Sequence, residues 1–341
     1  MKNAEKKLNT PLLLASLGAA LLVFIVLAVC AGKYPVSPGE SLSILLSRLT
    51  GAASPSSEMT VNVVMGLRVP RILASVLVGA ALSMSGAVYQ GIFNNPLISP
   101  DLLGVSSGAC VGAAIAILLS LSGGMVQLLA FIFGVAAVAL SLFIPGLMRN
   151  RSNIMLVLAG IIVGAAMSSA LGFIKYVADP ETQLASITYW TMGSFSAIKL
   201  SDIGAVLPAM IPSAIVILLL SWRIDILSMG ADDAKALGVN VPLVRTLAIV
   251  CATLLTASSV CIAGSISWVG LVIPHFARML AGANHSRLLP ASALLGAIFM
   301  LAVDTLTRTI SAFEMPVSIL TGVIGAPLYA VFLYRERRRM S

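Results

Sequence analysis

Long apolar runs recur along the whole chain, and short segments rich in polar residues separate them. The hydrocarbon core of a bilayer is about 30 Å thick, so a spanning helix needs ~20 mostly apolar residues. One run is short and another begins with arginines, so nine or eleven spans are alternatives to ten. The pattern predicts an all-α, polytopic integral membrane helical bundle, a single transmembrane domain over 1–341, with about ten spans at 12–31, 69–92, 102–121, 125–148, 154–174, 203–221, 242–263, 266–281, 288–307 and 317–334.

Two stretches differ from a plain spanning helix. The stretch 183–200 is too polar to cross a bilayer with ease, and it fits a short interfacial or re-entrant helix anchored by Tyr189 and Trp190. Near the N-terminus, lysines followed by an apolar run resemble a secretory signal peptide. That run has about 20 residues, against the usual ~7–15 of a signal peptide. We therefore expect it to be retained as the first span.

Composition supports the membrane assignment. The chain is 59% hydrophobic and only 10% charged, whereas soluble domains carry about 25% charged residues. Its net charge of +8 comes from basic residues in short segments between apolar runs, which favours membrane topology over nucleic-acid binding. The four cysteines lie in apolar runs without metal-binding spacing and are expected to be small buried hydrophobes. We expect no metal site and no nucleic-acid partner.

The 21 Lys and Arg residues indicate the orientation. Cytoplasmic loops carry an excess of these residues. If both termini are cytoplasmic and ten spans alternate, the basic residues divide two to one in favour of the inside. The inside residues are then Lys2, Lys6, Lys7, Arg149, Arg151, Arg223, Lys235, Arg245, Arg278, Arg287, Arg335, Arg337, Arg338 and Arg339. The outside residues are Lys33, Arg48, Arg68, Arg71, Lys175, Lys199 and Arg308.

Basic residues at the outer ends of two spans are candidates for a function. The segment GLRVPR places Arg68 and Arg71 at the start of the second span, where snorkelling to the interface competes with a positively charged docking surface. Asp304 and Arg308 lie four residues apart, a spacing at which an acid and a base pair on a helix. That pair is either self-contained, or Arg308 joins the other two arginines on the outer surface.

Polar segments also mark the inner side. In NNPLISPDLLGVSSGA (94–109) two prolines interrupt the helix and Asp101 is placed to cap the next one, so this turn is either a plain connection or an inner constriction. The segment GADDAKALGV (230–239) is flanked by glycines and has acidic residues first. It fits a short amphipathic helix on the cytoplasmic face, which is either a solvated linker or a helix that enters a soluble partner.

The segment WVGLVIPHFAR (268–278), followed by His285, has two histidines without a third ligand, so it predicts a structural role near the inner surface rather than a metal site. These segments, together with EMP-x5-G-x2-GAP (314–327), resemble in this order the FecCD-type permease family of iron-siderophore, haem and cobalamin ABC importers. The resemblance runs from about 60 to 334. The chain departs from the family pattern at Asn94, Ile98 and Asn284, and Asn94 stands where the family often has a charge.

The resemblance implies a type II ABC importer permease with about ten spans that lies in the bacterial cytoplasmic (inner) membrane and pairs with a second copy or a homologous permease. A periplasmic or lipoprotein substrate-binding protein would contact its outer rim, with Arg68, Arg71 and Arg308 as basic contacts. Two ATPase subunits would contact its inner side at a cytoplasmic coupling segment within about 222–241, through Gly230, Asp232, Asp233, Ala234, Lys235, Leu237 and Gly238.

An inner gate is implied as well, formed by Asn95, Pro96, Leu97, Ser99, Ser152 and Asn153. The sequence contains no GxxxxGK[ST] phosphate loop. We therefore expect a non-catalytic subunit that binds no cofactor, with ATP and Mg²⁺ on the partner ATPase. An iron(III)-siderophore-type chelate is the expected substrate, and haem or cobalamin is an alternative. An ion-coupled secondary transporter would place acids in mid-membrane, and the acidic residues here lie near span ends.

Overall fold

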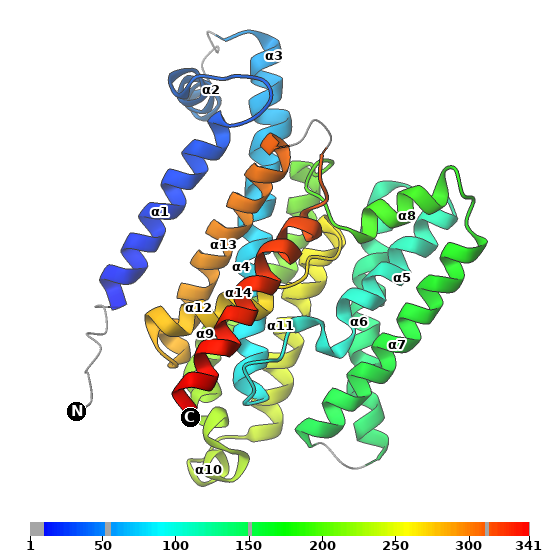
Figure 1. Ribbon diagram of the computed structural model, residues 1–341, viewed down its shortest axis with the longest axis vertical. Coiled ribbons are helices and arrows are strands. Elements are labelled where there is room, and N and C mark those ends of the chain that lie inside the picture. Colours follow the sequence, from blue (N-terminus) through cyan, green and yellow to red (C-terminus); the bar gives the residue numbers. More distant parts are fainter. Residues whose placement is uncertain (1–9, 52–55, 149–151, 311–313, 341) are drawn as a thin grey trace.

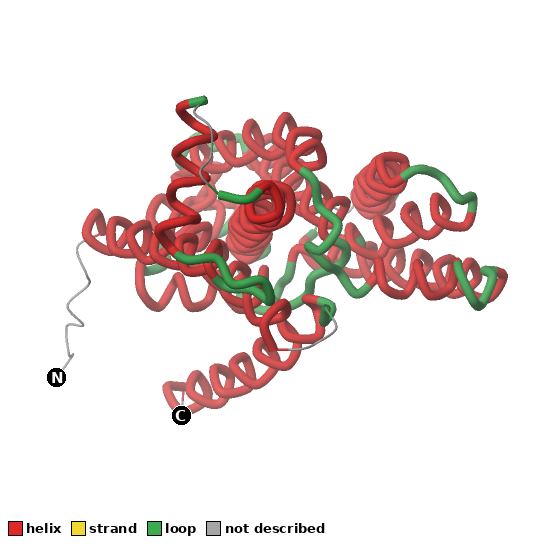
Figure 2. The backbone as a smooth tube through the Cα atoms, turned by 90° about the horizontal axis from the view of Figure 1, so that it is seen from above, coloured by secondary structure: helices red, strands yellow, loops and turns green. Residues whose placement is uncertain are grey.

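The computed structural model describes residues 10–51, 56–148, 152–310 and 314–340, and the regular elements of these ranges are all helices (Figures 1 and 2). Seven helices or continuous helical stretches are long and apolar enough to cross a membrane, and three apolar helices are shorter. Each of the ten predicted spans overlaps one of them. The ten are α1 (Thr10–Cys30), α4 (Val69–Ile92), α5 (Val105–Leu118), α6 (Gly123–Leu147), α7 (Asn153–Val177), α9 (Leu200–Met229), α11 (Val241–Ala263), α12 (Val269–Ala281), α13 (His285–Ile310) and α14 (Val317–Met340). The predicted all-α polytopic fold is confirmed.

Shorter helices connect them: α2 (Pro38–Thr50), α3 (Glu58–Val61), the π-helix η1 (Asn62–Arg68), the 3-10 helix η2 (Pro100–Leu103), α8 (Gln183–Thr191) and α10 (Ala231–Ala236). The stretch 183–200 does contain a short helix, α8, which is followed by a loop. The segments α3, η1 and α4 run on without a break, so this stretch is longer than the predicted second span.

The spanning helices alternate in direction (Figure 1). Helices α2, α3 and α8 lie at one end of the bundle, here called the α8 end, and α10 lies at the opposite end, here called the α10 end. Helix α1 begins and α14 finishes toward the α10 end. This arrangement agrees with termini on the same side as the predicted coupling segment. Among the basic residues used to predict orientation, Lys2, Lys6, Lys7, Arg149 and Arg151 lie outside the described residues.

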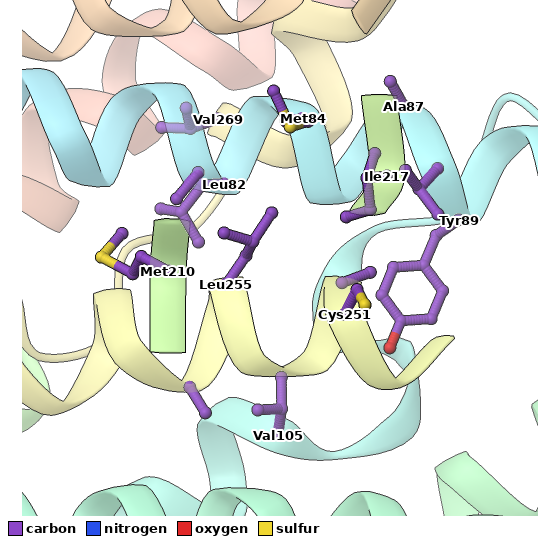
Figure 3. Close-up of a cluster of buried hydrophobic side chains, with 14 of the residues drawn as sticks. Leu82, Met84, Ala87, Tyr89, Val105, Met210, Ile217, Cys251, Leu255 and Val269 are labelled. Atoms are coloured by element: carbon purple, nitrogen blue, oxygen red, sulfur yellow. The ribbon is translucent and has the colours of Figure 1, made fainter. Parts of the chain in front are cut away.

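Helix α4 is at the centre of the bundle and is buried along most of its length. It packs against α9, α11, α12 and α13. Side chains of α4, α5, α9, α11 and α12 form the buried cluster in Figure 3, where Cys251 is one of the small apolar members. A Cβ on Gly79 would overlap the backbone of Gly296 in α13. Glycine therefore permits the close backbone approach that holds these two helices together.

Helices α5 and α12 are shorter than the runs that predict them, because the chain turns before each begins. Gly104 has a φ of +81° and ends the 3-10 helix η2, so α5 begins at Val105 rather than at 102. Gly264 and Trp268 have φ values of +73° and +74°, so α12 begins at Val269 rather than 266. Positive φ values stop a right-handed helix, and apolar residues on both sides of the turn conceal this from a hydropathy pattern.

Candidate docking, coupling and gate sites

Three arginines that are far apart in sequence meet at the α8 end. Arg68 ends η1, Arg71 lies in the first turn of α4, and Arg308 lies in the last turn of α13. The structure thus brings together the three residues predicted to contact a binding protein. They are only 5–7% exposed. The guanidinium groups are set into the bundle instead of standing out from its surface. We call Arg68, Arg71, Arg308 and their carboxylate partners Asp304 and Glu314 the arginine cluster.

Two of these arginines close the C-terminus of α1. Nη1 of Arg68 donates to the carbonyl oxygens of Val29 (2.6 Å) and Cys30 (3.2 Å), and Nη2 donates to the carbonyl of Tyr34. Nη2 of Arg308 donates to the carbonyl oxygen of Ala28 at 2.5 Å. The last carbonyls of a helix have no partner within it and carry its negative dipole end, so cations bind there favourably. The two side chains therefore fasten α1 to α4 and α13.

The third arginine is held by carboxylates. Nε of Arg71 lies 2.7 Å from Oδ1 of Asp304, and Nη1 lies 2.9 Å from Oε1 of Glu314. Asp304 is fully buried, and its Oδ2 lies 3.8 Å from Nε of Arg308. The sequence suggested an Asp304–Arg308 pair, but the short contact of Asp304 is with Arg71. Buried ions need partners of this kind because removal from water is expensive.

The arginine cluster still reaches an open surface. A hollow of about 210 Å³ is lined by Lys33, Arg68, Arg71, Arg308 and Glu314, with apolar neighbours. Four cations and two carboxylates, Glu314 and the buried Asp304, are gathered here, which leaves a positive excess. The electrostatic potential of such a surface attracts an acidic partner even though the guanidinium groups themselves are mostly buried.

The predicted coupling segment forms a distinct element at the α10 end. Helix α10 follows α9 after Gly230, whose φ is +136°, and Gly238, with a φ of +77°, follows its last turn. Ala234 is fully buried and anchors the helix, whereas the Leu237 side chain is 59% exposed. Glycine supplies the positive φ values at both ends at no steric cost. The result is a short, exposed helix held between two glycine turns.

Charged residues cover the outer face of α10. Asp232 and Lys235 form an ion pair at 3.2 Å, and their side chains are 97% and 64% exposed. Asp233 is exposed as well. An exposed pair of this type adds little to stability, so these side chains are available to a partner.

The predicted gate residues come from two places at the same end. The turn after α4 exposes Asn95, Pro96 and Leu97, and the Asn95 side chain accepts a hydrogen bond from the Leu97 backbone at 2.9 Å. Ser152 caps α7, and Nδ2 of Asn153 donates to the carbonyl of Phe93 at 3.5 Å. The start of α7 therefore contacts the gate turn through Phe93, the residue that follows the end of α4.

The gate and the coupling segment share one hollow. It has a volume of about 450 Å³, and its lining includes Asn94, Ser152, Asn153, Gly230 and Arg245. Of the predicted gate residues, Ser152 and Asn153 line it, whereas Asn95, Pro96, Leu97 and Ser99 do not. After Ser99 the chain has turned back into the bundle, where Pro100 lies close to Gly270 of α12. A shift of the turn at Gly230 therefore changes the shape of a space that gate residues also line.

A link that the sequence did not predict connects these parts. Nδ1 of His285, the first residue of α13, lies 2.6 Å from Oδ1 of Asp225, one turn before the end of α9. The His285 backbone also donates to that oxygen at 2.8 Å. A Cβ on Gly91 of α4 would overlap Nε2 of the same ring. The helix that leads into α10 is thus joined to the helix that leads into the gate, through one imidazole.

One sequence signal could have pointed to this link. Asp225 is a single acidic residue at the end of an apolar run, and acidic residues in membrane segments almost always have a partner. The expected structural role of His285 agrees with this geometry. A second bridge lies beside it: Nη2 of Arg278 donates to the Gln90 side chain at 3.1 Å, and Gln90 donates to the Leu271 carbonyl at 3.2 Å. Among the described residues, no group of three or more His, Cys, Asp or Glu side chains is arranged to hold a metal ion.

Comparison with known proteins agrees with these features. The model of the FecCD transport family matches residues 20–335. The chain is 39% identical over 328 residues to the molybdate import system permease protein MolB of Haemophilus influenzae, covering 96% of this chain and 97% of that protein. It is 40% identical over 275 residues to a probable iron chelatin transport system permease protein of Helicobacter pylori, covering 81% and 83%.

A solved structure gives the same result for the fold. It is an inward-facing conformation of an ABC transporter assigned to the metal-chelate type, with a TM-score of 0.83 and 37% identity over 96% of this chain and 99% of that chain. The fold and the sites thus define a multi-pass membrane permease. The chain belongs to the FecCD transport family and is an ABC importer permease.

Proposed function

We propose that this permease carries an iron(III)-siderophore-type chelate across the bacterial cytoplasmic membrane. The similarity to an iron chelatin permease and to a metal-chelate-type transporter supports this substrate class. Molybdate is the second candidate, because the similarity to MolB extends over nearly the full length of both chains.

The energy for transport comes from partner subunits. The sequence has no GxxxxGK[ST] loop, so two ATP-binding subunits carry ATP and Mg²⁺ and this chain is non-catalytic. A second permease, either another copy or a homologous chain, completes the membrane part. A periplasmic or lipoprotein substrate-binding protein delivers the chelate and selects it, so the permease itself needs little recognition of its cargo.

The α8 end faces outward in this proposal. The positive excess of the arginine cluster favours acidic residues on the two lobes of the binding protein, which approach Arg68, Arg71 and Arg308 over the hollow that they line. Because the same arginines hold α1, α4 and α13 together, docking of the binding protein would bear directly on the packing of these helices.

The α10 end faces the cytoplasm and the ATPases. ATP-driven closure of the ATPase dimer moves α10 about its glycine turns. That motion passes along the last turn of α9 to Asp225, through His285 to α4 at Gly91, and so to the gate turn at 94–99. ATP binding thereby shifts the population between inward- and outward-facing states.

Reconstitution tests substrate and coupling together. The permease is assembled with its ATPase and binding protein in proteoliposomes, and uptake of ⁵⁵Fe(III)-siderophores, iron-loaded haem, cobalamin and ⁹⁹Mo-molybdate is measured beside ATP hydrolysis. We expect saturable, ATP-dependent uptake of a ferric chelate. Uptake of molybdate alone would overturn the chelate proposal, and uptake driven by an ion gradient without ATP would overturn the importer mechanism.

Docking is tested in the same liposomes from the partner's side. Substitution of the arginines would also break their contacts within the permease, so the acidic surface residues of the binding protein are reversed instead. We expect uptake to fall steeply and to recover in part at high salt, because charge reversal places like charges opposite one another and salt screens their repulsion. Unchanged uptake would contradict the docking role.

A further inference from the structure

A groove runs down the bundle from the α8 end, separate from the docking, coupling and gate sites. Helices α6 and α9 form its walls, and α11, which packs against both, forms its floor. Its upper part has a volume of about 610 Å³ and lies under α8 and the loop 193–199. Its lower part has about 510 Å³ and shares Gly124, Gln127, Asp202 and Cys261 with the upper part. Both volumes are in the range of about 300–1,000 Å³ typical of ligand sites.

The two parts differ in chemistry. The upper part is lined by Lys199, Asp202, Ser186 and the aromatic residues Tyr189 and Trp190, which are typical of the membrane–water interface. The lower part is lined mainly by apolar residues of α6 and α9, including Leu128, Phe131 and Val206. From Asp202 to Ala209 it follows α9 for roughly 10 Å at 1.5 Å per residue. A polar head above an apolar channel matches the shape of a phospholipid.

The groove opens sideways toward the surroundings of the bundle. Leu128 on one wall is 49% exposed, and Ala205 on the other wall is exposed as well. A membrane helix with such a face meets lipid chains. Between these walls lies the Gln127 side chain, which makes no hydrogen bond with another described residue. Burying an amide in a membrane segment without a hydrogen-bond partner costs free energy. A polar ligand in the groove would supply that partner.

The charges at the rim indicate which headgroup fits. No ion pair with another described residue occupies the Lys199 ammonium group. Three residues later, Asp202 accepts a hydrogen bond from the Lys199 backbone at 2.9 Å and retains further acceptor capacity. A cation and an anion side by side complement a zwitterion, with a phosphate near Lys199 and an ammonium group near Asp202.

We propose that this groove binds one phosphatidylethanolamine molecule, with its headgroup between Lys199 and Asp202 and an acyl chain between α6 and α9. The primary ammonium group of this lipid donates hydrogen bonds to a carboxylate, whereas the trimethylammonium group of phosphatidylcholine has no N–H to donate. Phosphatidylglycerol lacks the cation altogether. Bound lipid fills the space between α6 and α9 and supports α8 from below.

Native mass spectrometry of the purified full-length permease tests the site, with the three lipids supplied in turn with identical acyl chains. We expect one phosphatidylethanolamine retained per chain, with a preference over phosphatidylcholine of about tenfold, as expected for a charge-assisted hydrogen bond. Asp202→Asn should abolish that preference. The variant retains an amide oxygen that can accept the hydrogen bond from the Lys199 backbone, so the start of α9 is preserved. Lys199→Gln should lower retention of all three lipids, and Lys175→Gln, at the same end but outside the groove, should leave it unchanged.

A second pair of variants blocks the channel. Ala205→Phe fills the space between the walls and should prevent retention of any lipid, while Gly204→Leu on the neighbouring position of α9, where a Cβ meets open space, should not. If Ala205→Phe does not accumulate, Ala209→Leu takes its place. Equal retention by the wild-type chain and the blocked variant, or equal retention of the three lipids by the wild-type chain, would overturn the proposal.

Discussion

The two ends of the bundle hold their charged residues in opposite ways. At the α8 end, Arg71 and Asp304 are buried and meet at 2.7 Å. In α10, at the opposite end, Asp232 and Lys235 meet at 3.2 Å with side chains that are 97% and 64% exposed. A buried pair has lost its water and depends on its partner, whereas an exposed pair exchanges partners at little cost. The Arg71–Asp304 pair is therefore fixed by its surroundings, whereas the charged side chains of α10 are open to a partner.

The largest effect is expected where the buried pair is broken. Arg71→Met leaves Asp304 buried beside Arg308 at 3.8 Å and leaves Glu314 without its short contact. Removal of one member of a buried pair costs about 3–5 kcal/mol of folding free energy. Thermal unfolding of the purified permease should show a large fall in Tm, and the double variant Arg71→Met/Asp304→Leu should recover part of it. Arg48→Met, at an exposed position on α2, is the control, and an equal Tm for Arg71→Met and Arg48→Met would contradict the comparison.

A smaller effect is expected at the link between α9 and α4, which lies within the α10 end. Gly91→Ala places a methyl group against Nε2 of His285, and the ring cannot turn away because Asp225 holds it at 2.6 Å. Overpacking of this kind costs about 1–3 kcal/mol. Uptake per ATP hydrolysed should fall by a large fraction while Tm falls only slightly, because the strain lies on the proposed route from α10 to the gate.

The matched control for that variant is Gly172→Ala in α7, where a new Cβ meets nothing within 4 Å. Alanine lowers the entropy of the unfolded chain and raises stability by ~0.4–1 kcal/mol at compatible sites, so its Tm should rise slightly. A fall in Tm without any change in uptake per ATP for Gly91→Ala would reduce His285 to a packing residue.

The smallest effect on stability is expected at the exposed pair of α10. The double variant Asp232→Asn/Lys235→Gln removes an exposed ion pair. The loss of such a pair changes the free energy of unfolding very little. The Tm should therefore match that of the wild-type permease at low and at high salt. In proteoliposomes the same variant should weaken ATP-driven uptake, because the outer face of α10 keeps only the charge of Asp233. A fall in Tm as large as that of Gly91→Ala would show that α10 is a structural brace.

The sequence predicts the spans well, because each one is a continuous apolar run and hydrophobic burial in a bilayer depends on run length. It predicts the sites less completely. Alternating spans place Arg68, Arg71 and Arg308 on the same side of the membrane, but neither their meeting nor the burial of their side chains follows from this. Their partners in α1 are backbone carbonyls, and every residue has a carbonyl, so no sequence pattern marks those that are used.

The link between Asp225 and His285 has the same origin. The two residues are 60 positions apart, and each is surrounded by residues typical of any helix end. Only the packing of α4, α9 and α13 brings them together. Conversely, a short helix was predicted within 230–239, and α10 occupies Ala231–Ala236 of that segment. Its signals are local, because the flanking glycines and the acidic residues of the first turn are visible in the sequence.

The bond from Arg308 to the carbonyl of Ala28 also bears on how the protein is made. Its two residues are separated by 280 positions, and ribosomes add about 5–20 residues per second. The C-terminus of α1 therefore waits on the order of tens of seconds in the membrane before its last side-chain partner is synthesised. Until then the first helix is held through Arg68 but is not fastened to α13. In a chain that stops before α13, the C-terminus of α1 lacks this partner permanently. Quality-control proteases of the membrane could distinguish an incomplete permease from a finished one by this difference.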